Sequence, residues 1–148
     1  MSAVQQSRQP VEASHVVEQL GRAVASERIG VDSDVLDSLS RDQAAWAPVG
    51  SAVAAVRARN TAEVAAVVAA CADLGVPVVA RGAGTGLSGG ANAVDGCVIL
   101  DLSKMDAIVE IDRDNLIAVV EPGVVNDDLK AAVGEVGLWY PPDPASSP

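Results

Sequence analysis

The chain has 148 residues, nearly half of them apolar, and a formal net charge of −10 at pH 7. A chain of this length suits one domain with a modest core, and its acidic excess without a basic run argues against binding to nucleic acid or to an anionic membrane. The apolar residues are mostly Ala and Val, which bury little area each, so we expect the core to be supported by a cofactor, a partner domain or more chain.

Residues 1–47 are predicted to form a helical and irregular extension in front of the main domain. The polar residues 1–13 contain no apolar segment of the kind that directs secretion, and no run of the chain approaches membrane-spanning length, so a cytoplasmic location is expected. A helix is predicted from Ser14, with His15 facing solvent and Gly30 as its stop. Its inner face is predicted to comprise Val16, Val17, Leu20 and Val24.

A strand–helix–strand unit is predicted to follow the acidic, irregular stretch 32–48, in which only a short helical piece is expected. Residues 52–57 read as a short strand, and Thr61 is expected to cap the next helix. Gly75 supplies a left-handed stop, and residues 76–80 form a continuous apolar strand, so the crossover should be right-handed. The helix should bury one stripe, made of Val64, Val67, Val68, Cys71 and Leu74.

A buried strand is predicted at residues 97–102, and a hairpin is predicted from residues 107–112 and 116–121. In the first strand of that hairpin, alternation places Val109 and Ile111 on one face. Cys71 and Cys97 lie in apolar stretches without metal-ligand spacing, so we expect buried free thiols and no metal site.

A last helix is predicted after the break at Pro122 and Gly123. Asn126 is expected to cap it and Gly137 to end it. Residues 140–148 are rich in proline and should form a stiff extended segment. The inner stripe of the helix is predicted to be Leu129, Ala132, Val133 and Val136.

The most informative segment is residues 81–90, with five glycines in ten positions. Glycine permits left-handed backbone conformations and a close approach of the backbone to a ligand. Consecutive N–H groups can then converge on an anion, and with so few cations in the chain this is the natural way to hold a pyrophosphate. The segment reads Arg81, Gly82, Ala83, Gly84, Thr85, Gly86, Leu87, Ser88, Gly89, Gly90.

Residues 84–89 match the dinucleotide fingerprint G-x-G-x-x-G as a string, but a Rossmann site needs a helix that opens at the loop. Residues 90–96 are turn-forming and a strand begins at Cys97, which leaves no room for such a helix. A Walker loop is excluded because no Gly-Lys-Ser/Thr follows the glycines. A protein-kinase loop is excluded because it needs a lysine on the next strand, and Lys104 comes after that strand. Two interpretations remain, a glycine-rich turn without a ligand and a strand–loop–strand phosphate cradle with no helix before Cys97.

This pattern closely resembles the FAD-linked oxidases of the vanillyl-alcohol oxidase and p-cresol methylhydroxylase (PCMH-type) superfamily. Within it, the chain is most similar to the branch of the glycolate oxidase FAD subunit, D-lactate dehydrogenase and D-2-hydroxyglutarate dehydrogenase. The matching stretches follow the order of the family's motifs and comprise residues 59–64, 75–79, 81–90, 121–123 and 140–146.

The resemblance implies a mixed α/β (α+β) fold, the first subdomain of a PCMH-type FAD-binding domain. Its parts would be a βαβ unit, a β-hairpin and a helix, without Rossmann topology. Residues 48–148 would form the N-terminal part of this domain. Members of the family continue with a second FAD subdomain and a substrate domain that hold the catalytic residues, so the resemblance assigns no catalytic residue to this chain.

The resemblance also implies where FAD would bind. Residues 81–87 would wrap its pyrophosphate, mostly through backbone N–H groups, and the turn at residues 122–123 would lie near the ADP half. Thr85 stands where some members carry the histidine that links the flavin covalently, so non-covalent FAD is expected. The implied cofactor-binding residues are Arg81, Gly82, Ala83, Gly84, Thr85, Gly86, Leu87, Pro122, Gly123, Pro142, Asp143, Ser146 and Ser147.

The implied function is FAD-dependent dehydrogenation of a small 2-hydroxy acid to the 2-oxo acid, with hydride transfer to flavin N5 and an electron carrier or quinone as the final acceptor. The alternatives are an FAD-linked oxidase of another alcohol, a phenol or a sugar, and a non-catalytic FAD- or nucleotide-binding fragment. The 148 residues alone are expected to be inactive and to self-associate through an exposed apolar face around Trp139, Tyr140 and the hairpin.

Overall fold

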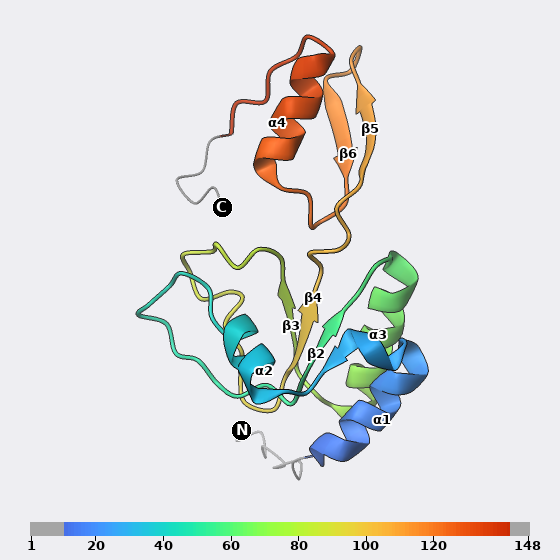
Figure 1. Cartoon of the computed structure of the whole chain (residues 1–148), viewed down its shortest axis with the longest axis vertical. Helices are drawn as coiled ribbons and strands as arrows, with labels where there is room; N and C mark the ends of the chain where they lie inside the picture. Colours follow the sequence, from blue (N-terminus) through green and yellow to red (C-terminus); the bar gives the residue numbers. More distant parts are fainter. Residues whose placement is uncertain (1–10, 143–148) are drawn as a thin grey trace, which may run out of the picture.

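The structure, a computed structural model, describes residues 11–142 and consists of two lobes (Figure 1). The first lobe is a four-stranded sheet with helices on both faces, and the second is a hairpin with one helix. The first lobe contains α1 (Ala13–Ala23), a 3-10 turn (Ser26–Arg28), β1 (Ile29–Gly30), α2 (Ser33–Leu39), β2 (Ala54–Arg57), α3 (Thr61–Leu74), β3 (Val78–Arg81) and β4 (Val98–Asp101). The second contains β5 (Ile108–Asp112), β6 (Ile117–Val120) and α4 (Asn126–Glu135).

The main sheet has the strand order β1-β2-β4-β3, in which β2, β4 and β3 are parallel and β1 is antiparallel to β2. The register places Arg57, Asp101 and Arg81 next to one another at the C-terminal ends of the parallel strands. The expectation that Gly30 stops the first helix is wrong, since α1 ends at Ala23 and Gly30 pairs with Ala55 in the sheet.

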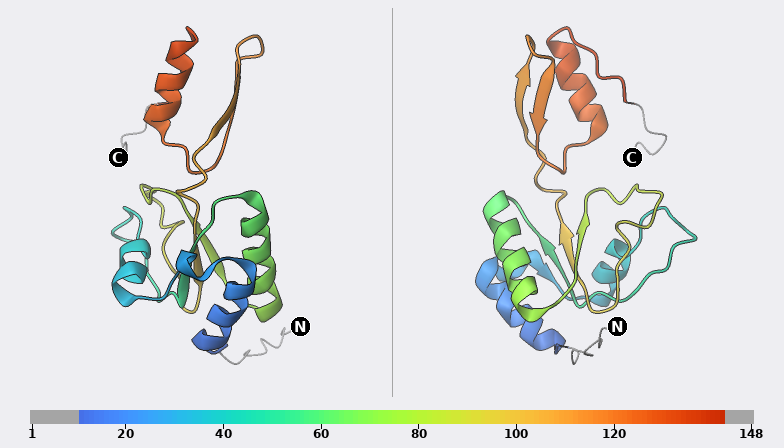
Figure 2. Two further views of the ribbon diagram at one scale, coloured as in Figure 1. Left: turned by 45° about the vertical axis from the view of Figure 1, so that its right-hand side comes forward. Right: turned by 180° about the vertical axis from the view of Figure 1, so that it is seen from behind.

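The two faces of the sheet are covered by different elements, as Figure 2 shows. Because side chains alternate along a strand, neighbouring residues of β2 and β4 enter different cores. The core under α1 and α3 contains Val16, Leu20, Val56, Val67, Cys71, Val98 and Leu100. The core on the α2 side contains Ala55, Ala93, Cys97 and Ile99, with Leu36 and Leu39 packed against it.

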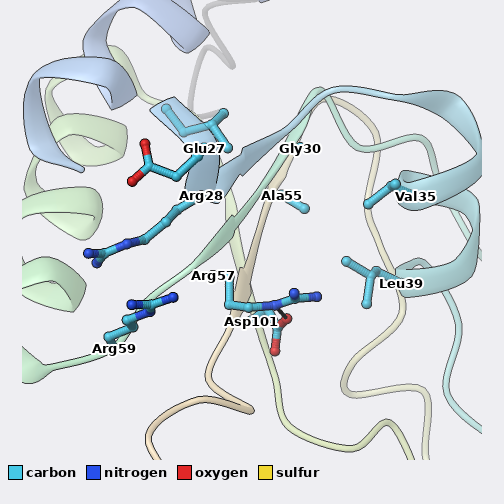
Figure 3. A pocket seen from close by; sticks show the side chains of 10 residues that line it. Glu27, Arg28, Gly30, Val35, Leu39, Ala55, Arg57, Arg59 and Asp101 are labelled. Carbon is cyan, nitrogen blue, oxygen red and sulfur yellow. Dashed lines mark hydrogen bonds and ion pairs between the residues drawn. The ribbon is translucent and has the colours of Figure 1, made fainter. Parts of the chain in front are cut away.

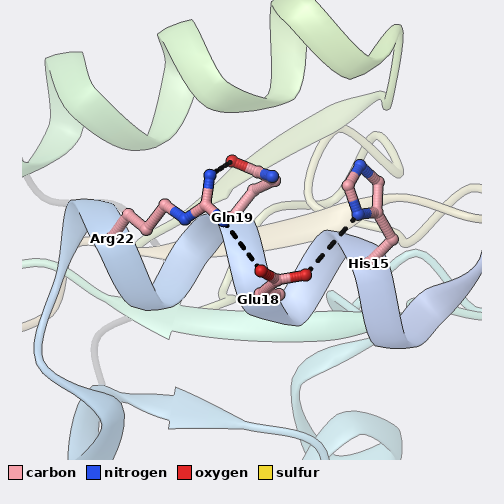
Figure 4. A network of polar contacts seen from close by, with 4 residues as sticks. All are labelled: His15, Glu18, Gln19 and Arg22. Carbon is pink, nitrogen blue, oxygen red and sulfur yellow. Dashed lines mark hydrogen bonds and ion pairs between the residues drawn. The ribbon is translucent and has the colours of Figure 1, made fainter.

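Helix α1 shares the main core with β2 and β4, so residues 11–24 are packed into the first lobe; the boundary at residues 47 and 48 stays a prediction. The outer face of α1 is polar (Figure 4). There Glu18 accepts a hydrogen bond from Arg22 at 2.7 Å and lies 3.8 Å from His15 Nδ1. His15 therefore faces solvent, as predicted from the sequence. None of the helices between residues 11 and 142 combines the length and the apolar character that crossing a membrane requires.

The cap of α3 differs from the prediction. Asn60, not Thr61, is the N-cap, and its side chain accepts a hydrogen bond from the Glu63 amide at 2.9 Å. Gly75 ends the helix in the left-handed conformation with φ 67°, as predicted. The buried stripe is narrower than predicted, because Val68 is 44% exposed. Both cysteines are buried free thiols, and burial raises the pKa of each.

The second lobe departs from its sequence pattern at a β-bulge. The register of β5 and β6 shifts between Ile108 and Glu110, and Val109 is 64% exposed. Cross-strand partners share a face, so Ile108, rather than Val109, lies on the same face as Ile111.

Helix α4 also begins differently from the prediction. Val125 is the N-cap, without a side-chain cap, and the side chain of Asn126 instead donates to the carbonyl of Pro142 at 3.3 Å. The chain after the helix therefore runs back to the start of α4. Leu138 N donates to Val133 O at 3.0 Å, and Gly137 has φ 76°, so this glycine ends the helix region as predicted.

The chain passes between the lobes once, in residues 102–107, and the turn at residues 121–125, which joins β6 to α4, lies beside this connector (Figure 1). Glu121 N donates to Ala107 O at 2.9 Å, and the Glu121 side chain accepts from Ala107 N at 3.0 Å. Gly123 N donates to Met105 O at 2.7 Å. These hydrogen bonds hold the turn that follows β6 against the connector between the lobes.

Candidate functional site

The glycine-rich segment leaves β3 at its C-terminal end and returns to β4 as an irregular loop. No helix lies between Arg81 and Val98. The prediction of a strand–loop–strand connection is therefore confirmed, and a Rossmann arrangement is absent here because it needs a helix whose N-terminus opens at the loop.

Two of the five loop glycines adopt the left-handed conformation that other residues avoid, Gly84 and Gly89, each with φ 75°. A Cβ on Gly84 would overlap the guanidinium of Arg81, and a Cβ on Gly89 would lie 2.6 Å from Cβ of Ala47. A Cβ on Gly86 would lie 3.2 Å from the Asp42 carboxylate. Backbone conformation therefore favours glycine at Gly84 and Gly89, whereas at Gly86 only the close approach of Asp42 disfavours a side chain.

The N–H groups of the loop are its main chemical feature. Within the described residues, none of the amides of residues 82–90 donates a hydrogen bond to a protein acceptor. Backbone N–H groups are strong donors that need water or a ligand when the protein offers no acceptor. A run of such donors in a loop with left-handed glycines is suited to an anion that accepts several hydrogen bonds, such as a pyrophosphate.

Arg81 lies at the start of this loop, but its side chain is engaged by the protein. Its guanidinium donates to the carbonyl of Arg41 at 2.6 Å and packs against Gly84. The arginine therefore ties the loop to the segment that follows α2.

The turn at Pro122 and Gly123 lies beside the start of the loop, although 40 residues separate Gly82 from Pro122. A Cβ built on Gly82 would lie 4.0 Å from the carbonyl oxygen of Pro122. Gly123 in turn packs against backbone, since a Cβ there would lie 2.8 Å from Met105 O. The structure thus brings together two of the three sequence stretches that the resemblance assigns to FAD.

The third stretch is described only at its beginning. Pro142 is hydrogen-bonded to Asn126 at the start of α4, and no hydrogen bond joins it to the loop within residues 11–142. Asp143, Ser146 and Ser147 lie outside the described residues.

Sequence reasoning missed the segment that supports the loop, residues 40–50. Asn92, buried at 6% exposure, accepts from Asp42 N at 2.8 Å. Gln43 N donates to Gly86 O at 2.9 Å. The sequence signal for it is the polar residue Asn92 next to the glycine run, and asparagine is equally typical of a turn.

A pocket of about 340 Å³ lies on the α2 side of the sheet, at the ends of β1 and β2 (Figure 3). Arginines line it, but two of them are paired: Arg57 Nε is 2.7 Å from Asp101 Oδ2, and Arg28 is bound to Glu63. Burial alone would raise the pKa of Asp101, but its hydrogen bonds from Arg57 and Ser103 outweigh this and hold the pKa below its usual value. The first pair joins the ends of β2 and β4, and the second joins the 3-10 turn to α3, so both are contacts within the protein.

The match to known families concerns the same region. A family model described as "FAD binding domain" matches residues 52–148, which contain the loop, the turn at residues 122–123 and the C-terminal segment.

Curated relatives include a glycolate oxidase subunit and a D-lactate dehydrogenase. The chain is 44% identical over 93 residues to the glycolate oxidase subunit GlcD of Bacillus subtilis (strain 168), covering 63% of this chain and 20% of that protein. It is 36% identical over 123 residues to a D-lactate dehydrogenase of Anaerostipes hadrus, covering 83% of this chain and 26% of that protein. The chain thus spans about a quarter or less of the length of these relatives.

Solved structures share the fold. p-Cresol methylhydroxylase with substrate bound aligns with 84% of this chain and 25% of its own, at a TM-score of 0.73 and 27% identity. Alkyldihydroxyacetonephosphate synthase aligns with 99% of this chain and 29% of its own, at a TM-score of 0.81 and 16% identity, which is a likeness of fold alone.

Proposed function

The chain belongs to the FAD binding domain family, and from this we propose that its glycine-rich loop binds the pyrophosphate of FAD within a flavin-dependent enzyme that oxidises a small 2-hydroxy acid. Membership confirms the resemblance stated from the sequence, the mixed α/β PCMH-type fold and FAD as the cofactor. The residues that hold FAD and the reaction are our proposals.

The observation that carries the proposed binding site is the run of N–H groups at residues 82–90 without a protein acceptor. The amides of residues 82–87 would donate to the phosphate oxygens, and the small residues Gly84 and Gly86 allow the phosphates to approach the backbone. The chain carries ten Lys and Arg against twenty Asp and Glu. Backbone N–H donors, rather than a cluster of cationic side chains, would therefore make most of the contacts to the pyrophosphate.

The turn at Pro122 and Gly123 would border the ADP half, because it lies beside Gly82 at the start of the loop. The segment that begins at Pro142 would continue toward the flavin, with Asp143, Ser146 and Ser147 as further contacts. Thr85 occupies the position where a covalent flavin link would need histidine, so we propose that FAD binds non-covalently.

The proposed substrate class comes from the relatives, which include a glycolate oxidase subunit and D-lactate dehydrogenases. FAD, when bound, supplies the acceptor for the hydride from C2 of the hydroxy acid, which leaves a 2-oxo acid. The contribution of the residues described here is to bind and orient the cofactor. We assign no catalytic residue within residues 11–142.

A second candidate is an oxidase of a phenol or a sugar, because the solved structures with this fold include p-cresol methylhydroxylase and a glucose dehydrogenase. The hydroxy acid is favoured because the relatives that bear that activity in their names match at up to 45% identity, against 27% and 17% for these two structures.

The test is the flavin spectrum of the intact protein under anaerobic conditions. We expect a bound flavin whose absorbance band bleaches with glycolate, lactate or 2-hydroxyglutarate and not with phenols or sugars. Bleaching by a phenol or sugar alone would favour the second candidate, and a protein that purifies without flavin and takes up none would refute the proposed function altogether.

A further inference from the structure

A second layer of the site is formed by residues 40–50, which lie behind the glycine-rich loop. Three backbone hydrogen bonds and one from a side chain join this segment to the loop and to Ala93, which follows the loop. Gln43 N donates to Gly86 O at 2.9 Å, Ala93 N donates to Ser40 O at 2.9 Å, and Gly50 N donates to Ala93 O at 2.7 Å. Arg81 adds its contact to the carbonyl of Arg41. The loop is therefore braced by a segment that is distant in the sequence.

Asn92 lies at the centre of this contact and is buried, with every hydrogen-bonding group of its side chain in use. Its Oδ1 accepts from Asp42 N at 2.8 Å, and its Nδ2 donates to Pro48 O at 3.2 Å and to Ala47 O at 3.5 Å. Its backbone N–H donates to Gly89 O at 3.1 Å. One residue thus joins both ends of the 40–50 segment to the last turn of the loop.

Asp42 complements Asn92 from the other side. Its Oδ1 accepts from Ala44 N at 2.8 Å, and its Oδ2 lies 3.5 Å from Ala91 N and beside Gly86. The carboxylate therefore satisfies N–H groups of the bracing segment and of the end of the loop. The amides of residues 82–90 receive no acceptor from it, and they stay available to a ligand.

We propose that Asn92 is a positioning residue for FAD: it holds the 40–50 segment against the loop and so keeps the N–H groups of residues 82–87 in their binding arrangement. The inference rests on the proposed function for its cofactor, but the bracing itself is a property of the protein alone. Asn92 acts through the backbone of the loop and does not contact the cofactor.

When a loop has to become ordered on binding, the free-energy cost of ordering it weakens the affinity for the ligand. Removing the Asn92 carboxamide would leave the carbonyls of Ala47 and Pro48 without this donor and the Asp42 amide without this acceptor. It would also leave a void at a buried position, and the loss of such hydrogen bonds is costly. The loop would then be free to sample other conformations, and FAD affinity would fall by about tenfold to a hundredfold.

The experiment compares Asn92→Ala, Asn92→Asp and the control Asn115→Ala in the intact protein. Asn115 also donates through its carboxamide, to Asp112 at 2.6 Å, but in the exposed hairpin turn. The first measurement is hydrogen exchange of the protein without FAD, and the second is the Kd for FAD by flavin fluorescence quenching. For Asn92→Ala, we expect faster exchange confined to residues 40–50 and 82–93 and an FAD affinity weakened about tenfold to a hundredfold.

The Asn92→Asp variant tests whether Asn92 positions the loop through its hydrogen bonds or only by filling space. The introduced carboxylate has the shape of Asn but presents oxygen, not N–H, to the carbonyls of Ala47 and Pro48. We expect its FAD affinity at neutral pH to be as weak as that of Asn92→Ala, and to recover as the pH falls and the buried carboxyl gains a proton that it can donate. Wild type and Asn115→Ala should show no such recovery.

The outcomes are separable. Unchanged exchange and unchanged Kd in Asn92→Ala would overturn the inference. So would exchange that increases equally in α3 and β4, since that would show a general loss of stability. If the wild-type protein does not bind FAD, the proposed function fails, whereas the exchange measurement still decides whether Asn92 holds the loop.

Discussion

Arg57 and Asp101 are bound to each other across the C-terminal ends of two neighbouring parallel strands, with Arg57 Nε 2.7 Å from Asp101 Oδ2. The Asp101 side chain is only 4% exposed, and Ser103 N also donates to it, at 2.9 Å. Burial opposes ionisation of this carboxyl, but the hydrogen bonds from Arg57 and Ser103 prevail and lower its pKa.

The first prediction concerns the pH dependence of stability. A group whose pKa is lower in the folded state stabilises the fold above its unfolded pKa of about 3.9, and this contribution is lost as the pH falls through the folded value. Asp101→Asn should therefore cost about 1–3 kcal/mol at pH 7, and the difference from wild type should shrink in acid. Urea unfolding at neutral and acidic pH measures this. Asp73→Asn, at an exposed position, is the control, and an equal loss at both pH values would contradict the prediction.

The second prediction concerns Gly84. A valine there would need a left-handed backbone and would overlap the Arg81 guanidinium, so Gly84→Val should abolish FAD retention, an affinity loss of at least about a hundredfold. The fold should largely persist. Gly90→Ala is the matched control, because a Cβ at Gly90 meets nothing within 4 Å. Flavin content after gel filtration is the measurement, and a Gly84→Val protein with full flavin would show that the loop is not the site.

The third prediction tests the cap of α3. Asn60→Ala removes the acceptor of the Glu63 amide and should cost about 1 kcal/mol in the free energy of unfolding. Thr61→Ala should cost less than about 0.5 kcal/mol, since Thr61 is exposed and does not cap the helix. Chemical denaturation of both variants provides the comparison. A larger loss in Thr61→Ala than in Asn60→Ala would reverse the assignment.

The fourth prediction concerns the 148-residue chain by itself. All residues of β6 are exposed, Trp139 is 82% exposed, and Leu116 is 74% exposed. An apolar strand that pairs with β5 on one side only favours association with another chain, so we expect the isolated chain to dimerise or aggregate and to bind FAD weakly. Ile117→Lys should reduce the association. Light scattering coupled to gel filtration and an FAD titration measure both, and a stable monomer with submicromolar affinity would contradict the prediction.

The elements that the sequence predicted well are those whose signals are local. The helix Thr61–Leu74 and its glycine stop follow from spacing and from the left-handed preference of glycine, and the loop after Arg81 follows from its composition. The two-residue strand β1 has no local signal, because it exists only through its pairing with β2. The bulge at Val109 likewise depends on the partner strand.

The candidate site divides in the same way. Its glycines could be identified from the sequence because the backbone freedom that makes them suitable follows from the residue type alone. The hydrogen bond from Asp42 to Asn92 joins residues 50 positions apart, and no periodicity or motif connects them. The contact between Gly82 and Pro122 could be anticipated only through the family resemblance.

The single connector at residues 102–107 has a consequence for how this protein can be cut or extended. A proteolytic cut within it would break the only covalent link between the two lobes in residues 11–142. Extra residues inserted there would have to leave the hydrogen bond from Gly123 N to Met105 O intact. A change in the relative orientation of the lobes is therefore expected to arise from the backbone of residues 102–107.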